Sequence, residues 1–346
     1  MSDQTFENLK ELPITLYQTQ CVSHKHEVLI CGGYEQRACY SYHTIKNEYK
    51  FICEYPSHIQ LIGHCVVKLI DNNNKDSNHI TLLSFGGSKK HTLVMKYVSV
   101  WSNKSNISNK LNKSNSYNEW IPFTDNHNHP IILEEIEITI GERVHVFDLN
   151  IFQFTKHDTL PTAAFSYIGY HCFVSRTENG QGQEMMKTNK QTYQMLLFYK
   201  KIGLSIEYDE DNNTFQFHQL LVCDDIAQFY YYAYVRINDV IFFFGGWNGM
   251  YGTNANVSKS VHKYSIRENK WTTFQNMLPS PLYDCIAILS EEDNHIHIIG
   301  GQNYKHESVP THMKIKVREL DHLLLVMIYL LFIYFDETQI NIIICN

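Results

Sequence analysis

The sequence predicts an all-β protein built from tandem repeats, and three observations support this prediction. Short apolar runs rich in β-branched and aromatic residues recur along the 346-residue chain, each bounded by polar turn residues. Glycine pairs end four of these runs at nearly regular spacing. Aromatic residues make up 13% of the chain, and this composition favours strands.

The clearest repeat runs from Tyr232 to Met277. Polar or glycine-containing turns divide it into four pieces, each about the length of a strand. A single four-stranded sheet of this kind cannot bury both of its faces. We therefore expect it to stack on copies of itself. The four expected strands are residues 232–235, 240–244, 261–266 and 271–274.

The other copies are located by glycine pairs that follow an apolar strand. The first two pairs are 54 residues apart and the last two are 55 apart, while the gap of 159 between them has room for two degenerate copies. Six repeats are therefore expected within one domain, residues 5–320, with anchors near residues 32, 86, 141, 199, 245 and 300. The pairs are Gly32 and Gly33, Gly86 and Gly87, Gly245 and Gly246, and Gly300 and Gly301.

These glycines have an expected structural role, because glycine permits positive φ and lets two backbones come close. The segment from Ile241 to Trp271 resembles the kelch repeat, in which an apolar strand and Gly-Gly are followed by a Tyr and then by a Trp. The resemblance implies a β-propeller with one four-stranded blade per repeat around a central channel. Six repeats then imply six blades. The third copy departs from the pattern, since it lacks a clean first strand and a glycine pair.

The two ends of the chain are expected to behave differently. The sixth repeat has no clear fourth strand, and Phe6 to Leu12 resembles the segment that ends other repeats. We expect this N-terminal strand to complete the sixth blade, which would close the ring and remove an open edge. At the other end, Leu323 to Phe335 is a run of thirteen apolar residues, fewer than the roughly 20 that a spanning helix needs. We expect the tail, residues 321–346, to be packed or poorly ordered, with membrane attachment through residues 323–335 as the alternative.

Composition limits the classes of function. The net charge is −7 and charged residues are 19% of the chain, which argues against a general nucleic-acid-binding protein. The nine cysteines are irregularly spaced and form no C-x-x-C motif, so we expect them to be reduced. The N-terminus lacks the apolar segment of a secretory signal. Together these features predict a cytoplasmic monomer without a cofactor.

No catalytic or metal-binding pattern is evident. His127 and His129 lie in a polar turn, and His295 and His297 lie on an expected strand, but a metal site needs three or four converging ligands. The carboxylates of residues 209–211 fall in an expected turn between strands. We therefore expect a protein that is not an enzyme. The alternative is a propeller enzyme similar to galactose oxidase, with a metal site at the channel mouth.

The loops that follow the glycine pairs are the expected binding surface. In propellers such loops lie on one face and vary while the blades hold them rigid. Exposed Trp, Tyr and Arg side chains dominate binding energy at interfaces, so we expect a protein partner here, as for a scaffold or adaptor. The alternative is that Trp247 and Tyr251 pack against the neighbouring blade. The candidate partner-binding residues are Tyr34, Arg37, Lys89, Lys90, Trp247, Tyr251, Asn303 and Lys305.

Overall fold

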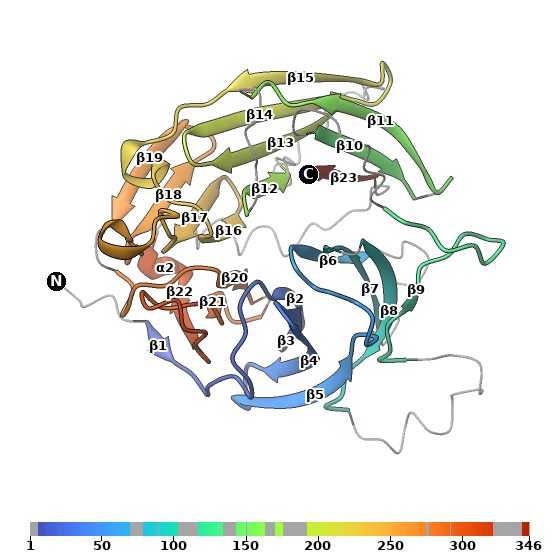
Figure 1. The fold of residues 1–346 in the computed structure, drawn as a ribbon, viewed down its shortest axis with the longest axis horizontal. Helices are drawn as coiled ribbons and strands as arrows, with labels where there is room; N and C mark the ends of the chain where they lie inside the picture. The colour runs from blue at the N-terminus through green and yellow to red at the C-terminus, as the bar shows by residue number, and fades with distance from the viewer. Residues whose placement is uncertain are drawn as a thin grey trace.

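The fold is an all-β propeller, shown by a computed structural model in which antiparallel sheets are arranged around a common axis (Figure 1). The structure describes residues 6–69, 79–88, 90–102, 117–133, 143–149, 151–162, 170–175, 192–274, 277–290, 292–320 and 341–345. Five of the sheets have four strands, and a sixth has three.

The first two blades come from the N-terminal third of the chain. Both follow the predicted order, with consecutive strands paired as neighbours. Blade 1 contains β2 (Gln20–His24), β3 (Glu27–Gly33), β4 (Gln36–His43) and β5 (Glu48–Glu54). Blade 2 contains β6 (His64–Leu69), β7 (His79–Gly86), β8 (His91–Val98) and β9 (Ile121–Pro122).

The fourth and fifth repeats also form complete blades. The fourth does so although Tyr199 and Lys200 replace its glycine pair. Blade 4 contains β12 (Cys172–Ser175), β13 (Thr192–Tyr199), β14 (Ile202–Asp209) and β15 (Thr214–Gln219). The short helix α1 (Asp224–Ala227) connects it to blade 5. Blade 5 contains β16 (Ala233–Ile237), β17 (Val240–Phe244), β18 (Val261–Ser265) and β19 (Lys270–Phe274), with the 3₁₀ turn η2 (Gly252–Asn254) between β17 and β18.

The last blade combines both ends of the repeat region. Its strands are β20 (Ile286–Leu289), β21 (His295–Ile299), β22 (His312–Lys316) and β1 (Glu7–Asn8), and α2 (Val317–Leu320) follows β22. Glu7 pairs with Lys314 and Asn8 with Met313, and Leu9 N–H donates to the carbonyl of His312 at 2.9 Å. The N-terminal segment therefore lies along the outer edge of this sheet.

The third repeat differs from the prediction, and for this reason the structure has five blades and not six. The five blades keep the numbers of their repeats, so they are blades 1, 2, 4, 5 and 6. It forms a three-stranded sheet of β10 (Arg143–Asp148), β11 (Gln153–Thr159) and β23 (Asn341–Cys345). Its expected first strand and anchor, residues 136–142, lie outside the described residues. The sequence of the repeat has no clean apolar strand or glycine pair there, and among the described residues the C-terminal strand β23 pairs with β10.

The predicted tail therefore contains a strand that the sequence analysis did not anticipate. Residues 321–340, including the apolar run 323–335, lie outside the described residues. Elsewhere in the chain, no helix that the structure describes has the length and apolar character needed to span a bilayer.

The core lies between adjacent blades, because each sheet buries apolar side chains against its neighbour. All five residues of β17 are buried, and Phe242 and Phe244 share one cluster with Ile296 and Ile298 of blade 6. Phe6 joins this cluster, with its ring 6.4 Å from that of Phe244. Stacking of blades thus supplies the burial that a single repeat lacks.

The glycine pairs are places where neighbouring blades touch. Gly245 (φ +67°) would direct a Cβ onto the carbonyl oxygen of Leu282, and the N–H of Gly246 donates to that same carbonyl at 2.9 Å. Gly300 (φ +66°) and Gly301 repeat this arrangement on the carbonyl of Leu16, at 2.7 Å. In these two pairs the first glycine therefore allows the next blade to come close, and the second one donates a hydrogen bond to it.

Candidate binding face around the propeller axis

Two loops from each blade build one face, which we call the axial face. One loop precedes the first strand of a blade, and the other joins its second and third strands. In blade 5 the two loops are tied by a reciprocal pair of backbone hydrogen bonds between Tyr230 and Trp247, at 2.8 and 3.0 Å. Tyr283 and Gln302 form the same pair in blade 6, at 2.8 and 3.1 Å. The loops are thus held in place by the strands beneath them.

Trp247 occupies the centre of an aromatic cluster on this face. Only 7% of its surface is exposed, and its indole N–H donates to the carbonyl of Met250 at 3.0 Å. The rings of Tyr283 and His306, both from blade 6, lie 5.4 and 5.3 Å away. Trp247 therefore packs against the neighbouring blade, which was the alternative interpretation of this residue. Tyr251 covers it from outside and is 73% exposed.

The other candidates on blade 6 lie close to this cluster. His306 contacts both Trp247 and Tyr251, with the ring of Tyr251 at 5.3 Å. In the same loop, the side-chain oxygen of Asn303 accepts hydrogen bonds from the N–H groups of Lys305 and Glu307. Asn303 thus shapes its loop, while Lys305 is exposed.

The candidates on the first two blades are not part of this cluster. Tyr34 stacks on Tyr17, with ring centroids 4.9 Å apart. Arg37 forms an ion pair with Glu54 at 3.4 Å within blade 1. Lys90 is in a turn closed by its N–H donating to the carbonyl of Gly87, and Lys89 lies outside the described residues. The remaining predicted residue, Trp271, is structural in position: its indole N–H donates to the carbonyl of Leu221 at 2.8 Å.

The sequence analysis missed a set of residues immediately before the first strands. In four blades a non-glycine residue adopts the left-handed conformation at this position, and in blade 2 the residue is Gly63. Positive φ is uncommon for residues with side chains, especially bulky ones such as tyrosine, and such strain concentrates at functional sites. We call these four residues the axial cluster: Gln18 (φ 53°), Tyr170 (φ 58°), Tyr231 (φ 57°) and Asp284 (φ 54°).

The axial cluster connects blades that are far apart in sequence. Backbone hydrogen bonds run from Gln18 N–H to the Asp284 carbonyl, at 3.0 Å, and from Asp284 N–H to the Tyr231 carbonyl, at 2.8 Å. The Gln18 side-chain amide N–H lies 3.2 Å from the Tyr170 hydroxyl and 3.4 Å from Asp284 Oδ2. The rings of Tyr170 and Tyr231 stack at 3.9 Å. Four loops therefore converge at the axis.

Asp284 is the buried ionisable group of this cluster. It is 8% exposed, and burial raises the pKa of its carboxyl to about 8, although Gln18 partly offsets the rise. Burial likewise raises the pKa of Tyr17 to about 12, with Tyr34 adding to the effect. The side-chain oxygen of Gln18 is buried, and no described residue forms a hydrogen bond with it. The cluster thus holds a carboxyl group and an amide oxygen that are both poorly satisfied.

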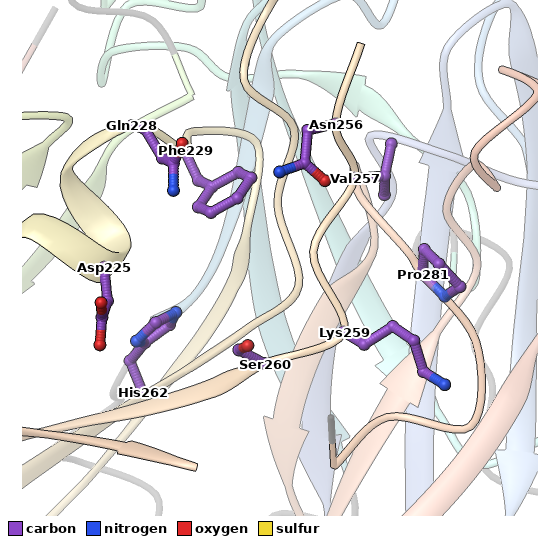
Figure 2. Close-up of a pocket in the computed structure, with 9 residues that line it drawn as sticks. All are labelled: Asp225, Gln228, Phe229, Asn256, Val257, Lys259, Ser260, His262 and Pro281. Atoms are coloured by element: carbon purple, nitrogen blue, oxygen red, sulfur yellow. The ribbon is translucent and has the colours of Figure 1, made fainter. Parts of the chain in front are cut away.

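A pocket lies beside the loop that joins β17 and β18 (Figure 2). Its volume is about 330 Å³. His262 of β18 forms part of the wall and is 1% exposed; its Nδ1 lies 3.1 Å from the Thr273 hydroxyl, while its Nε2 is buried without a partner. Burial lowers the pKa of His262 to about 4, so the imidazole is neutral at pH 7. Figure 2 shows Asp225 on the His262 side of the pocket and Lys259 on the other.

The histidine pairs singled out in the sequence have local partners. His129 Nδ1 lies 3.1 Å from Asp125, and His297 Nδ1 lies 2.8 Å from His312 Nε2. Within the described ranges, no group of three or more His, Cys, Asp or Glu side chains is arranged to hold a metal ion.

Comparison with known families agrees with this geometry. The kelch motif matches residues 228–278, which contain all four strands of blade 5. The chain thus carries a kelch motif within a β-propeller fold. The glycine pair of this kelch motif is Gly245 and Gly246, and its aromatic residue on the last strand is Trp271. A search of curated proteins gave no match.

Similar solved structures extend the comparison. YjhT is 14% identical and aligns over 90% of this chain and 97% of its own, with a TM-score of 0.54. At that identity the likeness shows the fold alone. An exo-1,5-alpha-L-arabinanase from a bovine ruminal metagenomic library is 7% identical, with coverages of 88% and 93% and a TM-score of 0.39. An endo-arabinase from Bacteroides thetaiotaomicron VPI-5482 is also 7% identical, with coverages of 90% and 97% and a TM-score of 0.41.

Proposed function

We propose that this propeller is a binding module that takes a protein partner on its axial face, with its blades closed into one ring through β1. The observation that carries the proposal is the exposure of large side chains there. Met250, Tyr251 and Tyr304 are 53%, 73% and 59% exposed, and they stand on the two adjacent loops of blades 5 and 6. Rigid loops that present exposed aromatic rings suit an interface.

The buried cluster beneath these rings supports the proposal energetically. Trp247, Tyr283 and His306 are packed together, so Tyr251 rests on a surface that is already ordered. Binding on a preorganised surface loses little conformational entropy. Lys305 adds a positive charge beside Tyr304, with its ammonium nitrogen 5.8 Å from the ring centroid.

Removal of the two exposed tyrosines is expected to abolish partner capture. The double variant Tyr251→Ala, Tyr304→Ala should retain less than about a tenth of each captured partner, because each aromatic anchor contributes about 2 kcal/mol or more to binding. Quantitative mass spectrometry of proteins that co-purify with the tagged chain measures this. Phe51→Ala is the matched control, because Phe51 is an aromatic residue that is 54% exposed on the outer strand of blade 1.

The expected result is a set of proteins lost in the double variant and retained with Phe51→Ala. Equal recovery by the wild type and the double variant would remove the axial face as the interface. Thermal unfolding of all three proteins checks that they are folded, and little change is expected because the substituted side chains are on the surface.

Small-molecule chemistry is the second candidate function, and the pocket in Figure 2 favours it. A buried, neutral His262 with one unpartnered ring nitrogen is suited to hydrogen-bond a ligand, or to accept a proton from it. The galactose-oxidase-like version also needs a metal. Metal analysis of the purified protein decides that version: a stoichiometric transition metal would support it, and a metal-free protein would dismiss it.

A further inference from the structure

We infer that the axial cluster is a binding site for a primary alkylammonium group, which the Asp284 carboxylate and the Gln18 amide oxygen hold beside the tyrosine rings. The inference deepens the proposed function and rests on it for biological context, because a lysine side chain of a protein partner is one source of such a group. A free amine is the other source. The lysine side chain and the free amine both carry the same –CH₂–NH₃⁺ group.

The first support is the pair of poorly satisfied acceptors. Among the described residues, the only side-chain hydrogen-bond partner of the Asp284 carboxyl is the Gln18 amide N–H, at 3.4 Å. The other end of the same amide, Gln18 Oε1, is buried without a partner. Buried acceptors in native proteins are almost always paired, so Gln18 Oε1 is suited to accept a hydrogen bond from a bound donor. An ammonium group supplies three N–H donors and also a charge that matches the carboxylate.

The second support is the aromatic lining. Tyr231 has the rings of Tyr170, Tyr230 and Tyr283 around it, with centroids 3.9, 4.6 and 6.3 Å away. Aromatic faces attract cations, and the attraction increases when the cation is removed from water. The same face already holds one cation in this way, because Lys200 Nζ lies 4.2 Å from the ring centroid of Tyr230.

The third support is the backbone. Gln18, Tyr170, Tyr231 and Asp284 all adopt positive φ, and this strained conformation aims four different side chains at one point. If these four residues served only to pack the loops together, they would not need polar side chains at this point. Gly63 takes the corresponding position in blade 2, and among the described residues no atom lies within 4 Å of a Cβ built there.

The chemistry of the lining distinguishes a primary ammonium from other cations. A guanidinium group is planar and favours a carboxylate with both oxygens free for bidentate binding, whereas Asp284 Oδ2 is already shared with Gln18. A quaternary ammonium has no N–H and would leave Gln18 Oε1 unpaired. A divalent metal prefers several oxygen ligands, and the described residues offer one carboxylate here.

Binding is expected to release a proton from Asp284 near neutral pH, because the buried carboxyl with its pKa of about 8 must ionise to pair with the cation. The titratable groups that face Asp284 are Tyr17, Tyr230, Tyr231, Tyr283 and Cys285, with His306 hydrogen-bonded to Tyr283 behind them. Burial raises the pKa of Tyr17 to about 12, and it also raises the pKa of Tyr231 and Tyr283, so these three hydroxyls stay protonated. Affinity should therefore increase as the pH rises from 6 to 9.

The experiment is calorimetric titration of the full chain with n-butylammonium chloride, at pH 7 and pH 9 and in buffers of different ionisation enthalpy. We expect a dissociation constant of about 1 mM at pH 9, weaker binding at pH 7 and release of about one proton at pH 7. Asp284→Asn should weaken binding at least about tenfold and eliminate the proton release. Asp239→Asn is the matched control, because Asp239 pairs with Arg267 at 2.7 Å on an exposed turn.

Tetramethylammonium chloride and N-acetyl-lysine-methylamide complete the test. Tetramethylammonium should bind at least about tenfold more weakly than n-butylammonium, since it has no N–H. Tighter binding of the lysine derivative would assign the group to a partner's lysine, and equal binding would assign it to a free amine. No binding of n-butylammonium, or equal binding by wild type and Asp284→Asn, would overturn the inference. Neither result bears on partner capture through Tyr251 and Tyr304, which is measured separately.

Discussion

Replacement of Asp284 by asparagine is expected to stabilise the protein in alkaline solution. The carboxyl of Asp284 is buried, and its pKa is raised from 3.8 to about 8. The unfolded chain therefore loses this proton near pH 4 while the folded chain keeps it until about pH 8. Folded Asp284 is favourable only when protonated, so the wild type loses stability as the pH rises through this window.

The neutral asparagine avoids that loss. Each pKa unit corresponds to 1.36 kcal/mol, so the stability advantage of Asp284→Asn should increase by about 4 kcal/mol between pH 5 and pH 9. Asparagine also tolerates the positive φ of this position. Urea unfolding of both proteins at a series of pH values measures the difference. A constant difference from pH 5 to pH 9 would show that Asp284 ionises normally in the folded protein.

Buried histidines affect this experiment equally in both proteins. Burial lowers the pKa of His64, His91 and His297 to about 4, so their contribution to stability is present above pH 6.5 and decreases as the pH falls. Subtraction of the wild-type curve from the variant curve removes this common effect. Only the difference between the two curves reports Asp284.

Gly245→Ala is the second substitution with a large expected effect. The new Cβ would overlap the carbonyl oxygen of Leu282 in blade 6, and Gly246 donates its N–H to the same carbonyl. The left-handed conformation at φ +67° costs alanine about 1–2 kcal/mol, and overpacking adds about 1–3 kcal/mol. We expect unfolding at a clearly lower temperature, with a total loss of about 2–5 kcal/mol.

Gly252→Ala separates the two causes. Gly252 has nearly the same φ, +71°, but a Cβ there meets no atom within 4 Å. This variant should lose only the conformational part, about 1–2 kcal/mol. Calorimetric unfolding of the two variants gives the comparison. Equal Tm values for Gly245→Ala and Gly252→Ala would mean that the approach of Leu282 contributes nothing to the stacking of blades.

The sequence predicted most of the fold because the glycine pairs mark contacts between blades. Gly245 and Gly300 occupy equivalent positions in their repeats because a backbone carbonyl of the following blade comes close to each of them. The fourth repeat lacks the glycines and still forms its four strands, so periodicity of apolar residues was sufficient there. The third repeat was mispredicted because β10 pairs with β23, about 200 residues later. No local sequence pattern predicts the pairing of two strands that are so far apart in the chain.

The arrangement of the axial face was predicted less well, for a physical reason. Residue type identified the loops after the glycine pairs, and Tyr251 and Lys305 are indeed exposed on them. Trp247, by contrast, is buried by rings from blade 6, which lie more than 30 residues away. The axial cluster gave only a weak signal, a polar or aromatic residue before each first strand. Positive φ at glutamine or tyrosine cannot be seen in a sequence, because such residues rarely adopt it.

The most direct test of the axial cluster is the ionisation of Asp284 itself. The ¹³C chemical shift of its side-chain carboxyl, assigned by its absence from the Asp284→Asn spectrum, can be followed by NMR from pH 4 to pH 10. We expect one titration with a midpoint near pH 8, in line with the raised pKa of a buried carboxyl that has a single long hydrogen bond. A midpoint near pH 4 would contradict the burial of Asp284 at the axis and, with it, the alkylammonium site.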